Sequence, residues 1–145
     1  LYKVKVLNLH KAGFGSGRRL SDAEIDKEKM AVITKLKDLE DLNLDKCHLC
    51  GIADLSGLSK LKKLSISDNY KTTHLFDFTP LQKLEELTLG SLALEKLPEG
   101  IFKLKNLKRL ELKAIFEVRA TLEDFKGLKA LTNIELFRLQ TSFND

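Results

Sequence analysis

One apolar pattern recurs through this chain of 145 residues, with aliphatic side chains at the first, fourth and sixth of six positions. Its six copies are Val4-x-x-Leu7-x-Leu9, Leu39-x-x-Leu42-x-Leu44, Leu61-x-x-Leu64-x-Ile66, Leu84-x-x-Leu87-x-Leu89, Leu107-x-x-Leu110-x-Leu112 and Leu131-x-x-Ile134-x-Leu136. The last five begin at 39, 61, 84, 107 and 131, so they are 22, 23, 23 and 24 residues apart. A period this constant predicts a stack of repeats, each of which buries its apolar side against its neighbours.

The second copy shows how one repeat folds. Leu42 and Leu44 lie two residues apart, which places them on one face of a short strand. Cys47 then turns the chain, and Leu49 re-enters the core. The segments that return to the next strand carry apolar residues three apart, which suits a short helical or 3₁₀ turn: Ile52, Leu55 and Leu58, then Leu75, Phe78 and Leu81, and later Leu122, Phe125 and Leu128. In the fourth copy Pro98 predicts an extended start to this segment.

The unit L-x-x-L-x-L-x-x-N/C-x-L resembles the leucine-rich repeat, in the short intracellular class of roughly 22 to 24 residues. The resemblance covers the chain except residues 13–35. It implies an α/β fold, namely a right-handed curved solenoid of about six repeats, with a concave parallel sheet and convex 3₁₀, helical or extended segments. The turn position, which the family fills with Asn or Cys, holds Ala12, Cys47, Asn69, Leu92, Ile115 and Leu139. This irregularity, together with the run Leu97-Pro98-Glu99-Gly100-Ile101-Phe102-Lys103-Leu104, is similar to plant intracellular immune receptors.

Residues 13–36 interrupt the array, because Val4 and Leu39 are 35 residues apart. The segment Gly13-Phe14-Gly15-Ser16-Gly17-Arg18-Arg19 predicts a surface loop. A phosphate-binding loop is the alternative, but the segment lacks a P-loop lysine and the full dinucleotide fingerprint. The capping box at Ser21 to Glu24 then begins a convex-face helix near residues 22–36. One side of this helix carries Ile25, Met30, Val32, Ile33 and Leu36.

The ends of the chain and its cysteines indicate whether it belongs to a longer protein and in which compartment that protein resides. Leu1 is already in repeat register and no initiator Met precedes it, so we expect residues 1–145 to form one repeat domain of a longer protein. No run approaches the roughly 18 apolar residues that a membrane span needs. Disulfide-bonded caps and Asn-x-Ser/Thr sites are also missing from the sequence, which favours an intracellular, cytoplasmic setting.

Few residues of the sequence suggest a metal site or a catalytic site. Cys47-His48-Leu49-Cys50 is metal-like, but structural zinc needs four ligands and no second pair exists, so we expect a buried thiol and no metal. His10 and His74 lie far away in sequence, and no serine has a nucleophile-elbow setting. We therefore predict a protein that is not an enzyme and needs no cofactor.

Recognition by the concave face is the predicted function. The residues that flank the two core leucines of each strand point to this face, and the predicted partner contacts are Asp41, Asp45, Lys63, Glu86, Arg109, Glu111, Lys113, Glu135 and Phe137. The net charge of +4 comes largely from lysines toward the rim, with little aromatic interleaving, so we do not expect nucleic-acid binding. The prediction is a protein–protein interaction scaffold. The alternative is the substrate-recognition or sensor region of a larger protein, such as a ubiquitin ligase or an intracellular immune receptor.

Overall fold

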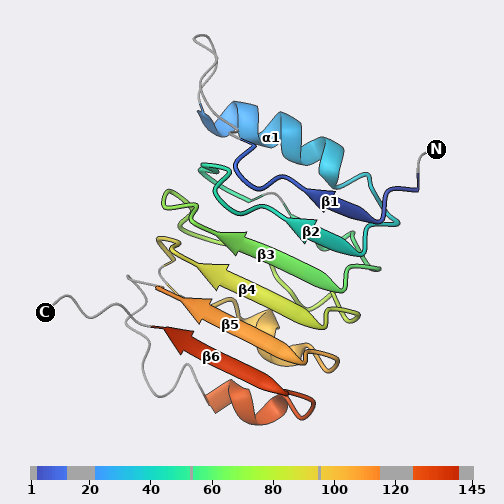
Figure 1. Ribbon diagram of the computed structural model, residues 1–145, viewed down its shortest axis with the longest axis vertical. Helices are drawn as coiled ribbons and strands as arrows, with labels where there is room; N and C mark the ends of the chain where they lie inside the picture. Colours follow the sequence, from blue (N-terminus) through green and yellow to red (C-terminus); the bar gives the residue numbers. More distant parts are fainter. Residues whose placement is uncertain (1–2, 13–21, 53, 95, 115–125, 141–145) are drawn as a thin grey trace, which may run out of the picture.

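The computed structural model describes residues 3–12, 22–52, 54–94, 96–114 and 126–140. Within them, six strands form one parallel sheet in chain order (Figure 1). The strands are β1 (Val6–Asn8), β2 (Asp41–Asn43), β3 (Lys63–Ser67), β4 (Glu86–Gly90), β5 (Arg109–Lys113) and β6 (Leu136–Gln140). Each strand pairs with the next along the chain, so each coil contributes one strand. The molecule is therefore a solenoid with a continuous parallel sheet, as the repeat pattern predicts.

The framework aliphatics form the core. Leu42 is fully buried, while its neighbours Asp41 and Asn43 are half-buried on the other face of the sheet. Strand pairing sets Leu42 beside Leu64, and the row continues through Leu87. Each such side chain contributes roughly 1.5–3 kcal/mol through its removal from water. The core is accordingly a strip that runs the length of the stack.

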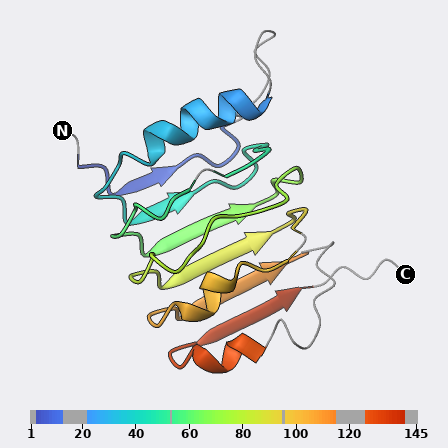
Figure 2. The ribbon, with the colours of Figure 1, turned by 180° about the vertical axis from the view of Figure 1, so that it is seen from behind.

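The return segments lie together on one side of the sheet (Figures 1 and 2). Two 3₁₀ helices occur among the described residues, η1 (Glu99–Lys103) and η2 (Lys126–Ala130). Pro98 precedes η1 with an extended backbone, at φ −62° and ψ 124°, as predicted. Earlier coils make single hydrogen-bonded turns instead, in which the N–H of Leu58 donates to the carbonyl of Leu55. The predicted residues Leu122 and Phe125 lie outside the described residues.

The strands end in a repeated left-handed residue. It occupies the same position in five successive coils, with φ between 47° and 60°, at Lys11, Lys46, Asp68, Ser91 and Ala114. None of these is glycine, although this conformation costs other residues roughly 1–2 kcal/mol each. The hydrogen bonds between coils offset that cost, as where the N–H of Lys46 donates to the carbonyl of Ser67 at 2.8 Å.

The turn position joins neighbouring coils where it is polar. Buried Asn69 donates from Nδ2 to the carbonyl of Leu44 at 2.9 Å, and its Oδ1 accepts the N–H of Leu49 at 3.1 Å. One coil earlier, the thiol of Cys47 donates to the carbonyl of Leu9 at 2.9 Å. Cys47 and Asn69 therefore have the same structural role, because the side chain of each bonds to the preceding coil.

The interruption after β1 contains helix α1 (Asp22–Ile33), which lies at the β1 end of the stack in both views (Figures 1 and 2). The predicted helix is thus confirmed, although it ends three residues before 36. Met30 and Ile33 are buried in the core, as expected. Val32 was placed on the same side, which is wrong, since it is 62% exposed. The predicted loop at 13–19 lies outside the described residues.

The last copy is displaced from its predicted register. Strand β6 pairs Leu110 with Phe137 and Leu112 with Leu139. The sixth framework triplet is therefore Ile134-x-x-Phe137-x-Leu139, three residues later than the predicted triplet that begins at Leu131. The step from the fifth copy, from Leu107 to Ile134, is 27 residues. The fifth connection is thus longer than the three before it, and a constant period gave the wrong alignment.

Candidate functional site

The face of the sheet opposite the core, here called the open face, carries three rows of side chains. Each row takes one residue from each successive coil. The first row is Val6, Asp41, Lys63, Glu86, Arg109 and Leu136, the second is Asn8, Asn43, Ser65, Thr88, Glu111 and Arg138, and the third is His10, Asp45, Ser67, Gly90 and Lys113. Seven of the nine predicted contact residues lie in these rows.

Charge alternates in sign along the middle of the first row. Asp41 aligns with Lys63, Lys63 with Glu86, and Glu86 with Arg109. The Lys63 ammonium lies 3.0 Å from a carboxylate oxygen of Glu86. Arg109 is exposed, and no described carboxylate lies within ion-pair distance of it. The row therefore offers one satisfied pair and an available guanidinium.

The carboxylate of Asp45 makes hydrogen bonds within the fold. Its Oδ1 accepts hydrogen bonds from the hydroxyl of Ser65 and from the N–H of Ser67, both at 2.8 Å. Its own N–H donates to Oδ1 of Asn43 at 2.9 Å. The carboxylate thus joins β2 to β3 at their carboxyl ends. Asp45 lies on the open face as predicted, and Oδ1 of its carboxylate accepts both of these hydrogen bonds.

Glu111 is the centre of a second charged group on the open face. A carboxylate oxygen lies 2.7 Å from the ammonium of Lys113 and 3.7 Å from the guanidinium of Arg138. The hydrogen bond from Lys113 lowers the pKa of Glu111, against an opposing effect of burial. Arg138 was missed from the sequence, because the predicted register placed it outside the strand.

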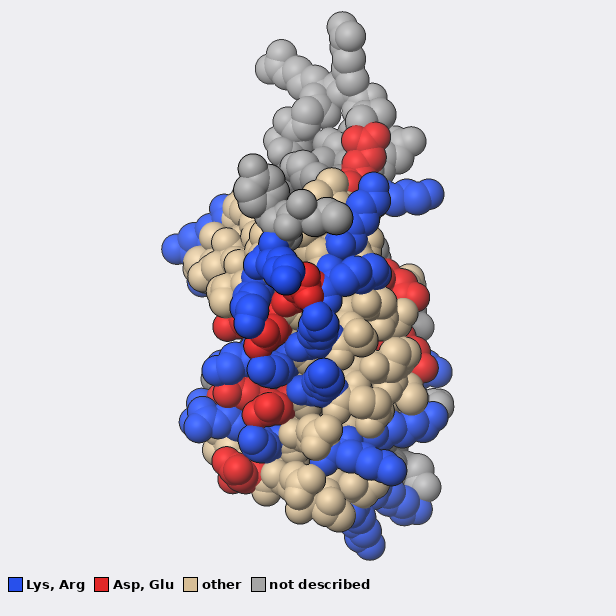
Figure 3. Space-filling model, turned by 90° about the vertical axis from the view of Figure 1, so that its right-hand side faces the viewer, with Lys and Arg blue, Asp and Glu red and all other residues tan. Residues whose placement is uncertain are grey.

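A row of residues directly before the strands forms what we call the rim ladder. Its members are Lys5, Glu40, Lys62, Glu85, Lys108 and Glu135, and each N–H from Glu40 onward donates to the carbonyl of the preceding member. The Glu40 carboxylate lies 3.0 Å from Lys5 and 2.7 Å from Lys62, and Lys108 lies 2.8 Å from Glu85. Figure 3 shows this edge, where basic and acidic side chains interleave. Sequence reasoning treated these lysines as solvated and missed the alternation.

The lysines of the rim ladder lower the pKa values of its carboxylates Glu40 and Glu85. Hydrogen bonds from Lys62 and then Lys5 lower the pKa of Glu40 from 4.5 to about 2. Lys108 likewise lowers the pKa of Glu85, and Glu85 raises the pKa of Lys108. Exposed pairs of this kind add little stability singly. Their alternation sets lysines beside glutamates of the neighbouring coils, so that unlike charges meet along this edge.

Two predicted contacts lie off the open face. Glu135 belongs to the rim ladder, because its N–H donates to the carbonyl of Lys108 before β6 begins. Phe137 pairs with Leu110 and therefore points to the core side of the sheet. It is 37% exposed because β6 is the last described strand. The placement of both residues on the concave face was wrong, and the cause is the three-residue error in register.

The described residues contain no cluster of three or more potential metal ligands. Cys47 and Cys50 are not joined by a disulfide, and Cys47 is buried. Across the part of the chain that the structure describes, no helix is long and apolar enough to cross a membrane.

Comparison with known proteins adds no relative, since no protein-family model and no curated protein matches this chain. The geometry of the open face and the rim ladder therefore carries the functional argument.

Proposed function

We propose that this chain is a leucine-rich-repeat solenoid whose open face, the concave face of that fold, recognises a protein partner without catalysis. The observation that carries the proposal is the first row of the open face. Asp41, Lys63, Glu86 and Arg109 stand side by side on four hydrogen-bonded strands. Such a row presents a fixed sequence of charges to whatever lies across it.

Rigidity supports this proposal. The backbone positions in the row are set by strand pairing, and their neighbours Leu42, Leu64, Leu87 and Leu110 are at most 2% exposed. A partner that binds here need not order the backbone, so less of the interaction free energy is lost to conformational entropy. A fixed pattern of opposite charges steers encounter and sets the register of docking.

The arrangement of charge favours a protein over a nucleic acid as the partner. Six lysines among the described residues lie within 3.0 Å of a carboxylate oxygen, namely Lys5, Lys60, Lys62, Lys63, Lys108 and Lys113. A phosphate backbone needs a basic track that releases counterions along its length. Here both the open face and the rim ladder alternate in sign. A surface on which positive and negative side chains alternate suits a protein partner, because the surface of a protein also carries charges of both signs.

A reducing, cytoplasmic location is part of the proposal. The Cys47 thiol donates a hydrogen bond to the carbonyl of Leu9, which a disulfide sulfur could not do. Cys50, three residues on, forms no disulfide with Cys47. The fold therefore uses cysteine in its reduced form, as proteins in the cytosol generally do.

A pair of charge swaps tests the site. The double variant Lys63→Glu/Glu86→Lys keeps the net charge and the internal ion pair, but it inverts the charge order on the open face. The matched variant Glu85→Lys/Lys108→Glu does the same on the rim ladder. Partners captured from a lysate of the source cell should be lost with the first variant and retained with the second. Retention by the open-face variant, with the native circular dichroism spectrum, would refute the proposal.

A further inference from the structure

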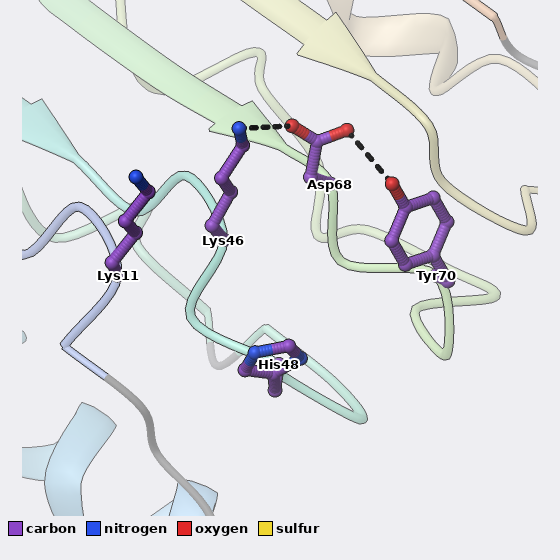
Figure 4. Close-up of a pocket in the computed structure, with 5 residues that line it drawn as sticks. All are labelled: Lys11, Lys46, His48, Asp68 and Tyr70. Atoms are coloured by element: carbon purple, nitrogen blue, oxygen red, sulfur yellow. Dashed lines mark hydrogen bonds and ion pairs between the residues drawn. The ribbon is translucent and has the colours of Figure 1, made fainter.

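A pocket of about 450 Å³ opens where the first three strands end, and we call it the strand-end pocket. Its lining residues are Lys11, Lys46, His48, Asp68 and Tyr70 (Figure 4). They come from three successive coils, after β1, β2 and β3. Lys11 and Lys46 follow His10 and Asp45 of the open face directly, so the pocket adjoins that face.

The backbone of the pocket is fixed in an unusual way. Lys11, Lys46 and Asp68 hold the same left-handed position in neighbouring coils, at φ of 60°, 57° and 56°. His48 is also left-handed, at φ 56°, and it does not belong to that repeated position. Four of the five lining residues therefore have a backbone conformation that few side-chain-bearing residues adopt. The repeated position is also left-handed at Ser91 and Ala114 outside the pocket, so His48 is the lining residue whose conformation departs from the repeat.

The charges in the pocket are loosely satisfied, in contrast with the rim ladder. Lys46 lies 3.8 Å from Asp68, whereas the ladder pairs lie at 2.7–3.0 Å. The phenol of Tyr70 donates to the other oxygen of Asp68 at 3.2 Å, and the Asp68 charge raises the pKa of that phenol. Figure 4 shows Lys11 beside Lys46 with no acidic residue drawn next to it. Among the described residues no carboxylate lies within ion-pair distance of Lys11.

We propose that the strand-end pocket binds one side-chain carboxylate of an acidic peptide segment in the partner protein. This inference rests on the proposed function, since it names the chemistry of a segment that crosses the adjoining open face. The carboxylate accepts hydrogen bonds from the ammonium groups of Lys11 and Lys46. Lys46 moves from its long contact with Asp68 toward the incoming anion, while the Tyr70 phenol continues to hold Asp68.

Charge balance selects a carboxylate. Two lysines and one aspartate of the lining sum to a formal charge of +1, which one carboxylate neutralises. A phosphate dianion would leave the pocket with a net negative charge beside Asp68. The pocket volume of about 450 Å³ leaves room for a side-chain carboxylate.

The test uses a fluorescein-labelled hexaglutamate peptide and its hexaglutamine counterpart, with binding to the native chain followed by fluorescence anisotropy at physiological salt. We expect saturable binding of hexaglutamate alone. The variant Lys11→Met/Lys46→Met should raise Kd about tenfold, because it removes two charge-assisted hydrogen bonds. The matched variant Lys83→Met/Lys105→Met removes the same charge from exposed sites elsewhere and should change Kd less than about twofold.

A third variant separates binding from folding defects. Asp68→Asn removes the competitor for Lys46 and should lower Kd severalfold, a gain that damage to the fold could not produce. The proposal is overturned if Asp68→Asn weakens binding or leaves it unchanged, or if the two lysine variants lose affinity equally. It is also overturned if a phosphoserine peptide binds more than tenfold tighter than hexaglutamate. Each of these failures leaves the open-face proposal standing, because the charge-swap experiment measures that proposal separately.

Discussion

Replacement of Asn69 by alanine is the sharpest test of how neighbouring coils are joined. The side chain is fully buried and bonds to the carbonyl of Leu44, the carbonyl of Ser67 and the N–H of Leu49. Alanine leaves the Leu44 carbonyl and the Leu49 N–H buried without their side-chain partner. Each stranded group costs about 1–3 kcal/mol. We therefore expect Asn69→Ala to lower the free energy of unfolding by about 3–4 kcal/mol.

The equivalent position one coil earlier provides an internal comparison. Cys47→Ala removes a thiol, which is a weaker donor, from the carbonyl of Leu9 and should cost about 1–2 kcal/mol. The control is Asn106→Ala, which loses an exposed bond from Nδ2 to the carbonyl of Gln82 at 2.7 Å and should cost under about 1 kcal/mol. Urea unfolding followed by circular dichroism measures all three, provided that the slope with urea is unchanged. A cost for Asn69→Ala no greater than that for Cys47→Ala would refute this account of the coil contacts.

Three further predictions concern the side of the return segments, the rim ladder and the turns. Gly100→Ala should destabilise by about 1–3 kcal/mol in urea unfolding, because its Cβ would lie 2.7 Å from the backbone nitrogen of Phe78; an unchanged midpoint would contradict this. The depressed pKa of Glu40 means that its contribution, present above 4.5, is lost as pH falls toward about 2. Thermal melts of Glu40→Gln should therefore vary less with pH over that window than native melts, and equal slopes would exclude the effect. Ala114→Gly should stabilise by about 0.5–1 kcal/mol, since φ is 47° there, and a lower melting temperature would count against the turn assignment.

The sequence predicts the solenoid well because the same physical requirement recurs in every coil. Each strand needs two aliphatic side chains two residues apart, and Leu42 and Leu44 satisfy it in the same way as Leu110 and Leu112. Helix α1 was predictable for a local reason, namely a capping box followed by Met30 and Ile33 at helical spacing. Both signals are local, and neither depends on how long a connection is.

The last coil shows where that reasoning fails. The apolar pattern fits Leu131, Ile134 and Leu136, and it fits Ile134, Phe137 and Leu139 almost as well. Only the pairing of β6 with β5 distinguishes the two alignments, and pairing is a tertiary property. The assumption of a constant period selected the wrong one. The same error moved Phe137 and Glu135 onto the open face.

The rim ladder was visible in the sequence but needed the correct alignment to be recognised. Lysine and glutamate alternate at one position before each strand, from Lys5 to Glu135. Read one residue at a time, each is an ordinary surface charge. The strand-end pocket was beyond prediction, since it depends on left-handed residues in three coils that bring Lys11, Lys46 and Asp68 together.

The most direct test of the central claim is site-specific photo-crosslinking in the source cell. A photoreactive residue placed at Arg109 reports on the open face, and one placed at Lys103, which is exposed in η1, reports on the side of the return segments. The account predicts a covalent adduct with a partner protein from position 109 and none from position 103. Adducts from position 103 alone would place recognition on the opposite side of the sheet and contradict the account.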